Sequence, residues 1–424
     1  MNVLLVGSGG REDALAWALS RSPRLTRLIA APGNPGIARY ASCVNLKETA
    51  AESLVALAAR EGVDLTVVGP ELPLSLGLAD RFREARLRIF GPTKAAARLE
   101  SSKAFAKDLM GRHGIPTARF GAFSDAAAAR RYCRELGAPL VVKADGLAAG
   151  KGALVCRTLE DADRAVALCL EERAFGDAGG TVVIEEFMEG EEVSFFVLSD
   201  GSTALPLASA QDHKTVFDGD RGPNTGGMGA YSPTPAFDPA TEQRVMAEIV
   251  LPVIRAIQHE GVPYQGVLYI GLMLTREGPR VVEFNCRFGD PECQVIIPRL
   301  QGDLLPLLMA VADGHGLPTA LNWHGDASVC VVLSSAGYPG PYETGHPIRG
   351  VEDAERMTGV TVFHAGTAHR DGHLVTAGGR VLGVQALGSG VSDAVARAYA
   401  AVARIKFKGM HYRKDIGRRA LGRS

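Results

Sequence analysis

Residues 281–292 read VVEFNCRFGDPE, in which apolar and polar side chains alternate before a Gly-Asp-Pro turn. The alternation predicts a β-strand with Glu283, Asn285 and Arg287 on one face, because successive side chains of a strand point to opposite faces. Val282 and Phe284 would lie on the other face. Carboxylate and amide oxygens two residues apart can share one hard cation such as Mg²⁺. An arginine beside them could stabilise charge on a transferring phosphoryl group, so we favour this function over an ordinary solvent-exposed strand.

A lysine and a glycine-rich segment follow another predicted strand. Lys143 ends the apolar run 140–143, and residues 145–152 read DGLAAGKG. The segment is not a Walker A motif, because its glycine spacing is too short and Gly152 replaces the Ser or Thr. A lysine beside bare backbone still suits a triphosphate, since the cation neutralises phosphate oxygens and the loop can approach them closely. A solvated lysine at a strand end is the alternative.

Two adjacent carboxylates end a third apolar strand. Residues 181–188 read TVVIEEFM, so Glu185 and Glu186 lie at the strand end, and Glu192 follows shortly after. The backbone at such a strand end can offer a donor and an acceptor to adenine, and the later carboxylate can bind ribose hydroxyls. In isolation, the segment favours a solvated acidic turn.

The first hundred residues alternate short apolar runs with amphipathic segments. Runs that end in Gly or Pro lie at residues 3–6, 28–31, 65–68 and 87–90. This βα repeat predicts a parallel sheet whose ligands bind beyond the carboxyl ends of the strands. The turn GSGGRE at 7–12 lacks a dinucleotide motif, because Glu12 stands at the third glycine. It can still bind phosphate through backbone N–H groups at a helix start, and a tight turn without a ligand is the alternative.

Length and pattern predict more than one unit. The chain of 424 residues exceeds the size of one hydrophobic core, about 250–300 residues. Ser101 and Ser102 before Lys103 predict an N-cap and a helix that starts a second unit. Its predicted strands are 140–143, 181–185, 193–198, 266–274 and 280–285, with helices at 126–136 and 159–172. A small α+β lobe follows, with strands at 327–334, 360–365 and 379–386 and a helix at 392–405.

Composition argues against several kinds of partner. Lys+Arg 46 against Asp+Glu 47 leaves a formal charge of −1, so no global charge attracts nucleic acid or an acidic membrane. The chain begins on a strand-like run and has no apolar run of about 18 residues, which predicts a cytoplasmic protein. Seven cysteines without a C-x-x-C pair predict reduced packing thiols.

A polar, glycine-dense stretch spans residues 211–231. It contains QDHK at 211–214 and GPNTGGMGAY at 222–231. Long loops of this kind in compact domains are usually functional or disordered. His213 could act as a metal ligand or general base, but a loop histidine without a paired carboxylate is more often neither.

At these residues the chain resembles the phosphoribosylamine–glycine ligases, a family of the ATP-grasp superfamily. The likeness runs from Val3 to about Gly417 and rests on GGRE at 9–12, KADGLAAGKG at 143–152, PNTGGMGAY at 223–231 and RFGDPE at 287–292. The resemblance implies an α/β and α+β multidomain fold. Residues 1–100 would form a parallel-sheet βα lobe, 101–325 the ATP-grasp domain with a mobile flap near 120–192, and 326–424 a small α+β lobe.

The same resemblance implies ligation of glycine to 5-phosphoribosylamine in purine biosynthesis, through a glycyl phosphate, with ATP and Mg²⁺ or Mn²⁺. The protein would act on small molecules as a monomer or weak homodimer, without nucleic acid or membrane partners. Its ATP ligands would be Lys103, Lys143, Lys151, Glu185, Glu186, Phe187, Met188 and Glu192. Glu283 and Asn285 would bind the metal, and Lys143 and Arg287 would be catalytic. The substrates would lie among Gly9, Gly10, Arg11, Asp212, Lys214, Thr225, Gly226 and Asp290.

Two departures from the family pattern affect these expectations. Asp13 stands where the family usually has His, which leaves the role of that side chain open. Residues 266–274 carry no carboxylate, although many ATP-grasp enzymes place a metal ligand there, so water and phosphate would complete the coordination. Two alternatives stay open. One is an ATP-grasp ligase with another acid and amine, such as a biotin-dependent carboxylase, and the other is a nucleotide sensor with an idle site.

Overall fold

The computed structural model describes residues 1–148 and 152–422. Its N-terminal part is a parallel sheet in the order β3-β2-β1-β4-β5. The strands are β1 (Asn2–Gly7), β2 (Arg27–Pro32), β3 (Ser42–Cys43), β4 (Leu65–Val68) and β5 (Ile89–Phe90). The predicted βα repeat is therefore confirmed.

Helices cover both faces of this sheet. They are α1 (Gly10–Leu19), α2 (Ala51–Arg60), α3 (Glu71–Ser75) and α4 (Leu78–Glu84). Alternate side chains of β1 enter different cores: Val3 and Leu5 pack with α1, whereas Leu4 and Val6 pack with α2 and α4. Because α1 and α3 each begin three residues after the neighbouring strands β1 and β4 end, both helix N-termini lie at the carboxyl edge of the sheet.

Two antiparallel sheets form the central part, in the orders β11-β10-β16-β17 and β6-β9-β7-β8. The first contains β10 (Glu191–Asp200), β11 (Ala204–Pro206), β16 (Gln265–Thr275) and β17 (Gly278–Asn285). The second contains β6 (Phe120–Phe123), β7 (Leu140–Ala144), β8 (Ala153–Cys156) and β9 (Val182–Glu186). Their helices are α5 (Arg98–Ser101), α6 (Lys103–Arg112), α7 (Ala126–Leu136), α8 (Leu159–Val166), α9 (Pro239–Val245) and α10 (Leu251–His259).

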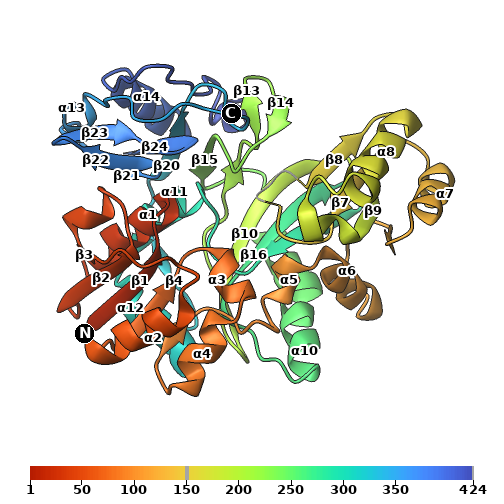
Figure 1. Cartoon of the computed structure of the whole chain (residues 1–424), viewed down its shortest axis with the longest axis horizontal. Coiled ribbons are helices and arrows are strands. Elements are labelled where there is room, and N and C mark those ends of the chain that lie inside the picture. Colours follow the sequence, from red (N-terminus) through yellow and green to blue (C-terminus); the bar gives the residue numbers. More distant parts are fainter. Residues whose placement is uncertain (149–151, 423–424) are drawn as a thin grey trace.

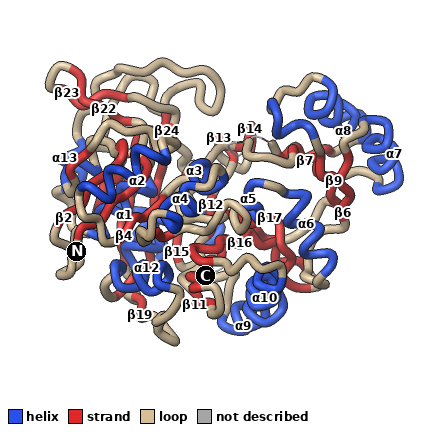
Figure 2. The backbone as a smooth tube through the Cα atoms, turned by 60° about the horizontal axis from the view of Figure 1, so that its bottom comes forward, coloured by secondary structure: helices blue, strands red, loops and turns tan. Residues whose placement is uncertain are grey.

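Helices sandwich the first central sheet and cover the second. Helix α10 packs on one face of β10 and β16, and α12 (Leu304–Asp313) packs on the other. Helices α7 and α8 pack on the second sheet. Figure 1 shows this second sheet with α7 and α8 at the end of the molecule away from the N-terminal sheet, and Figure 2 shows the same separation from another side.

The C-terminal sheet has the order β12-β15-β20-β24-β21 and packs against α14 (Val391–Val402). Its strands are β12 (Gln211–Asp212), β15 (Gly229–Ser232), β20 (Ala327–Ser334), β21 (Val360–His364) and β24 (Arg380–Gly388). The remaining elements include β13 (Thr215–Phe217), β14 (Arg221–Asn224), α11 (Cys293–Ile296), β18 (Leu300–Gln301), β19 (Asn322–Trp323), α13 (Val351–Glu355), β22 (Thr367–Arg370), β23 (His373–Thr376) and α15 (Arg418–Leu421). The polar stretch 211–231 thus supplies two strands of a sheet that is otherwise made after residue 326.

The predicted alternation along residues 281–285 is wrong in one respect. The register between β16 and β17 shifts between Gly271 and Leu272, which places an extra residue in β17. As a result Val281, and not Val282, is buried together with Phe284.

All seven cysteines are free and six of them are buried, as the absence of a C-x-x-C pair predicted. Within residues 1–148 and 152–422, no helix is both long enough and apolar enough to cross a membrane.

Candidate active site

The candidate site lies where β17 of the first central sheet approaches β7 and β9 of the second. Lys143 near the end of β7 is buried, and its Nζ donates to Oε2 of Glu185 at 2.9 Å and to the carbonyl of Val282 at 3.0 Å. A lysine ammonium has three N–H donors. Two of them bond to groups of the protein that the structure describes, and within that part of the chain the third has no partner and can bind a ligand.

Two further lysines reach this place from α6. Lys103 begins the helix, and its Nζ donates to the carbonyl of Gly146 at 3.1 Å. Lys107, one turn later, pairs with Glu185 at 3.2 Å and donates to Oγ1 of Thr117 at 2.7 Å. Burial lowers the pKa of both lysines, that of Lys107 to about 8. Lys107 was not among the residues predicted from the sequence, although its spacing of four residues from Lys103 on a predicted helix places both on one face.

The predicted adenine-binding segment 185–188 leaves β9 beside these lysines. Glu185 is buried and pairs with two of them, so its side chain holds the lysines together. Glu186 pairs with Arg280 at 2.8 Å. These pairs contradict the solvated acidic turn that the segment favoured in isolation. Lys151, the remaining predicted ATP ligand, lies outside the described residues.

Glu283 and Asn285 lie two positions apart at the C-terminal end of β17. Burial works against ionisation of Glu283, but Lys214, Lys143 and other cations outweigh burial and hold its pKa below the ordinary value. An ionised carboxylate and an amide oxygen fit the preference of Mg²⁺ for oxygen ligands. Among the described residues, no group of three His, Cys, Asp or Glu could hold a metal. An ion at Glu283 would therefore need further ligands from nucleotide and water.

Arg287 does not continue the strand face of Glu283 and Asn285, which corrects the predicted alternation. Strand β17 ends at Asn285, and Arg287 reaches the N-terminal lobe. Its Nε donates to Oε2 of Glu71 at 3.1 Å, and its Nη2 donates to Oε1 of Glu100 at 2.9 Å. Arg287 departs from the strand face because its partly buried guanidinium needs carboxylate partners, which the alternating side chains of a strand do not supply.

Lys214 links predicted substrate residues to predicted nucleotide and metal residues. It forms ion pairs with Glu192 on β10 and with Glu283, the latter at 3.6 Å. Its carbonyl accepts hydrogen bonds from the backbone N of Thr225 at 2.7 Å and from its Oγ1 at 2.8 Å. Asp212 lies two residues earlier, and burial, with repulsion from other carboxylates, raises its pKa to about 8 although Lys214 opposes the shift. The structure therefore brings these predicted residues together.

Arg380 of β24 joins the other predicted substrate residues. It pairs with Asp290 at 3.0 Å and donates to the carbonyl of Gly226 at 2.6 Å. The turn at Gly9 and Gly10 packs against the same carboxylate, since a Cβ on Gly9 would lie 3.5 Å from Oδ2 of Asp290. Arg380 could not be predicted from the sequence, because no motif contains it and only the pairing of the C-terminal sheet brings it to Asp290.

A side chain of the protein already occupies the N-terminus of α1. Oε2 of Glu12 accepts from the backbone N of Gly9 at 2.6 Å, and Oε1 accepts from Nε of Arg11 at 2.5 Å. Nη1 of Arg11 donates to the carbonyl of Phe288 at 3.1 Å. Glu12, which breaks the dinucleotide motif, therefore fixes the turn and takes one N–H group expected to face a phosphate.

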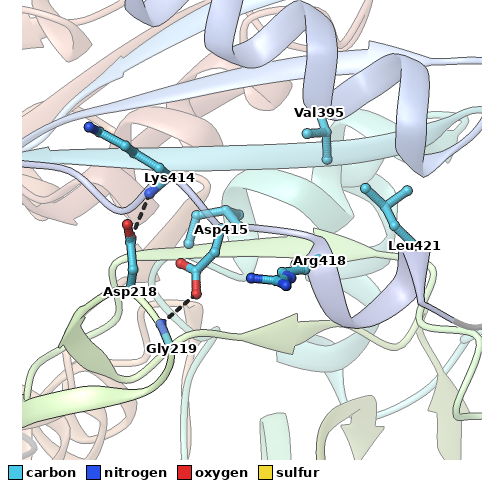
Figure 3. A pocket seen from close by; sticks show the side chains of 8 residues that line it. Asp218, Gly219, Val395, Lys414, Asp415, Arg418 and Leu421 are labelled. Carbon is cyan, nitrogen blue, oxygen red and sulfur yellow. Dashed lines mark hydrogen bonds between the residues drawn. The ribbon is translucent and has the colours of Figure 1, made fainter.

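Two hollows lie elsewhere on the molecule. One of about 380 Å³ lies between the β13-β14 turn and the C-terminal segment, where the backbone N of Lys414 donates to Asp218 and that of Gly219 donates to Asp415 (Figure 3). The other, of about 600 Å³, lies between β13 and the segments 336–340 and 409–411. None of the predicted site residues that the structure describes lines either hollow. The candidate site is therefore identified by the charged side chains that meet where β17 approaches β7 and β9.

Comparison with known families decides the class of the chain. Family models described as the phosphoribosylglycinamide synthetase N domain, ATP-grasp (A) domain and C domain match residues 1–100, 101–293 and 328–419. The chain belongs to the phosphoribosylglycinamide synthetase family. The resemblance inferred from the four motifs is confirmed, and so is membership of a ligase family with an ATP-grasp domain.

Relatives of this family match along the whole chain. A phosphoribosylamine–glycine ligase of Mesorhizobium japonicum is 54% identical over 423 residues, which cover 100% of this chain and 99% of the relative. One of Pseudomonas aeruginosa is 51% identical over 426 residues, with the same coverage of 100% and 99%. The crystal structure of a phosphoribosylamine–glycine ligase from Thermotoga maritima superposes with a TM-score of 0.86 at 32% identity, covering 98% of this chain and 100% of that chain.

Solved structures of lower identity show a common fold with this member of the phosphoribosylglycinamide synthetase family. A biotin carboxylase from Campylobacter jejuni, solved as a β-γ-ATP complex, superposes with a TM-score of 0.74 at 17% identity, covering 97% of this chain and 92% of that chain. Identity this low shows a common architecture and says nothing about a common substrate. The carboxylase alternative therefore gains no support beyond the fold.

Proposed function

We propose that this chain ligates glycine to 5-phosphoribosylamine at the expense of ATP, which yields glycinamide ribonucleotide, ADP and phosphate in purine biosynthesis. The observation that carries the proposal is the convergence of Lys103, Lys143 and Glu283 where two sheets meet, in a chain of the phosphoribosylglycinamide synthetase family. Full-length similarity to phosphoribosylamine–glycine ligases supports this substrate pair over another acid and amine.

The chemistry requires an activated acid. A free carboxylate resists attack by an amine, because its leaving group would be oxide. Transfer of the γ-phosphoryl group to a carboxylate oxygen of glycine gives glycyl phosphate and releases ADP. The amine of phosphoribosylamine then attacks the carbonyl carbon, loses a proton and expels inorganic phosphate. The chain has no recognisable nucleophile and base pair in its motifs, so an acyl-enzyme is not invoked.

Several cationic groups of the site suit this transfer. Lys103 and Lys143 would hold nucleotide phosphates, since each keeps at least one N–H donor without a partner among the described residues. Arg287 would donate hydrogen bonds to the transferring phosphoryl group and the acyl phosphate. The backbone of 185–188 would bind adenine, and Glu192 would bind the ribose.

A divalent cation would complete the nucleotide site. Glu283 and Asn285 would hold Mg²⁺, or Mn²⁺ in its place, as their oxygen donors fit a hard cation. When bound, the ion neutralises charge on the phosphate oxygens of ATP.

The substrates of ligation would lie between the N-terminal and C-terminal parts of the chain. The groups around glycine and phosphoribosylamine would be Asp212, Lys214, Thr225, Gly226 and Asp290, with Gly9, Gly10 and Arg11. We assign residues 1–100, 101–325 and 326–424 to three domains, and the part we propose to move as a flap is 120–192, which contains the second central sheet with α7 and α8.

A turnover assay tests the proposal. Purified protein is mixed with Mg-ATP, glycine and phosphoribosylamine, and ADP is measured while each component is omitted in turn. We expect ADP only when both glycine and the amine are present. ADP release with bicarbonate and biotin would overturn the substrate assignment, and nucleotide binding without any turnover would favour a sensor. Lys143→Met should abolish turnover, whereas Lys408→Met, on an exposed lysine, should not.

A further inference from the structure

Arg287 is held by two carboxylates that come from different parts of the chain. Glu100 of α5 accepts from Nη2 through Oε1 at 2.9 Å, and its Oε2 accepts from the backbone N of Cys286 at 2.7 Å. Glu71 is the first residue of α3 in the N-terminal sheet region, and its Oε2 accepts from Nε of Arg287 at 3.1 Å. The guanidinium is therefore fixed along one edge by a residue of the βα lobe.

The remaining donors of Arg287 can be counted. A guanidinium has five N–H groups in one plane. Nε donates to Glu71, one Nη2 hydrogen to Glu100, and one Nη1 hydrogen to the carbonyl of Phe288 at 3.3 Å. Among residues 1–148 and 152–422, one N–H on each terminal nitrogen has no partner. The direction of these two donors depends on the plane in which the other three are held.

The two carboxylates differ in the direction of their pKa shifts and in their exposure. Burial raises the pKa of Glu100, and Arg287 only partly opposes this. Burial also works against ionisation of Glu71, but Arg287 and Arg11 outweigh it and lower the pKa of Glu71 to about 2. Glu71 is thus ionised at neutral pH. Its side chain is 28% exposed while that of Glu100 is 7% exposed, so Glu71 can be changed with less disturbance of the core.

We propose that Glu71 is a positioning residue for Arg287, which sets the plane of the guanidinium so that its two unused N–H groups face the phosphoryl group in transfer. The proposal rests on the proposed function of Arg287. Because an ion pair with a carboxylate offsets the charge of Arg287, the arginine acts mainly through directed hydrogen bonds. Nη1 of Arg11 lies 4.0 Å from Oε2 of Glu71, so the same carboxylate also faces the turn expected to bind the amine substrate.

Variants of Glu71 separate the effect of where its acceptor oxygen lies from the effect of its negative charge. Glu71→Gln keeps an acceptor oxygen at the same reach without the charge, whereas Glu71→Asp keeps the charge but withdraws it by one methylene. Glu71→Ala removes both. Glu61→Ala is the matched control, because Glu61 lies in the same lobe, pairs with Arg27 at 2.9 Å and has a similarly exposed side chain.

Two kinetic measurements are made on each variant. One is kcat with the KM values for ATP and glycine. The other is glycine-dependent scrambling of oxygen-18 from the β,γ-bridge of ATP, which reports reversible formation of glycyl phosphate without the amine. We expect Glu71→Ala and Glu71→Asp to lose about 10- to 100-fold in kcat and in scrambling, as small misplacements of catalytic groups do. Glu71→Gln should lose less than about threefold, and KM for ATP and the Tm should change little in all three.

The opposite pattern overturns the proposal. If Glu71→Asp is as active as the wild type and Glu71→Gln as impaired as Glu71→Ala, charge and not position is what matters. Equal losses in Glu71→Ala and Glu61→Ala, each with a lower Tm, would show that Glu71 only attaches the lobe. A crystal structure of Glu71→Ala gives a reading independent of turnover: a displaced guanidinium supports the proposal, and an unmoved one refutes it. Wild-type protein that forms no ADP with glycine and phosphoribosylamine would instead refute the proposed function, and the crystal structure would still decide the role of Glu71.

Discussion

Asp13 of α1 and His364 of β21 are 351 positions apart, yet Oδ2 of Asp13 accepts a hydrogen bond from the backbone N of His364 at 2.7 Å. The same oxygen accepts from Nη2 of Arg39 at 3.3 Å, and Arg39 also donates to Glu355 of α13 at 2.7 Å. Asp13 is fully buried. The side chain that departs from the family pattern therefore helps to join the N-terminal lobe to the C-terminal lobe.

This buried carboxylate should make stability depend on pH. Burial raises the pKa of Asp13 to about 7 from an ordinary value of 3.8, although Arg39 opposes the shift. Between these values the folded protein binds more protons than the unfolded chain, so the free energy of unfolding falls as pH rises. The decrease should be at most about 1.4 kcal/mol per pH unit and should end above the folded pKa.

The Asp13→Asn variant isolates this effect. The asparagine cannot titrate. The Tm of the variant relative to that of the wild type should therefore rise as pH increases from 4 to 7, and this difference in Tm should stay constant above pH 7. Thermal unfolding of both proteins at several pH values measures this. A difference that does not change with pH would show that Asp13 has the same protonation state in both the folded and unfolded chain.

Glu283→Gln and Asn285→Ala should each raise the concentration of Mg²⁺ needed for half-maximal turnover. Glu283→Gln removes the negative charge of one proposed ligand, and Asn285→Ala removes the oxygen of the other. A hard cation binds through both the number and the charge of its oxygen ligands. Mg²⁺ titrations of ADP formation measure this requirement. Glu277→Gln, on an exposed carboxylate in the turn just before β17, serves as the control. Unaltered titrations in both site variants would remove these residues from a metal site.

Arg287→Ala should reduce kcat by about 100- to 1,000-fold, as the loss of an oxyanion donor does, with nearly unchanged affinity for ATP. Arg287→Lys should not restore activity, because a single ammonium cannot satisfy Glu71 and Glu100 and still present two directed N–H groups. Steady-state kinetics and nucleotide binding separate the two effects. A tenfold or greater loss of ATP affinity would place Arg287 in nucleotide binding.

Backbone hydrogen exchange over residues 140–148 should slow when Mg-ATP binds. Lys103 donates to the carbonyl of Gly146, and Oδ1 of Asp145 accepts from the backbone N of Ala104 at 2.6 Å, so the segment after β7 is bonded to the start of α6, where we propose that phosphate binds. Exchange measured with and without Mg-ATP checks the prediction, and Lys103→Ala should remove the slowing. Equal exchange with and without nucleotide in the wild type would contradict it.

Local patterns predicted the regular elements well, because their determinants are close together in sequence. Helix α7 spans Ala126–Leu136 as its spacing predicted, and Oγ of Ser102 accepts from the backbone N of Phe105 at 3.1 Å as an N-cap. Glu283 and Asn285 lie in one strand as the alternation predicted, and their role as oxygen ligands of a metal stays a prediction.

Contacts between distant segments could not be predicted in the same way. The alternation of residues 281–287 gave no sign that Arg287 would leave the strand for Glu71, since its partner lies in another lobe. Arg380 and the Asp13–His364 contact depend on how the C-terminal sheet docks against the rest. The burial of Glu185 between lysines could not be predicted either, because its ion pairs depend on contacts between segments far apart in the sequence.

The central claim is that glycine is activated as an acyl phosphate before the amine attacks. The most direct measurement uses glycine with oxygen-18 in both carboxylate oxygens, and follows the label in inorganic phosphate by mass spectrometry. Because the carboxylate oxygen that accepts the phosphoryl group leaves with it, we predict one labelled oxygen in phosphate for each amide formed. Phosphate without label, formed at the rate of the amide, would contradict this account.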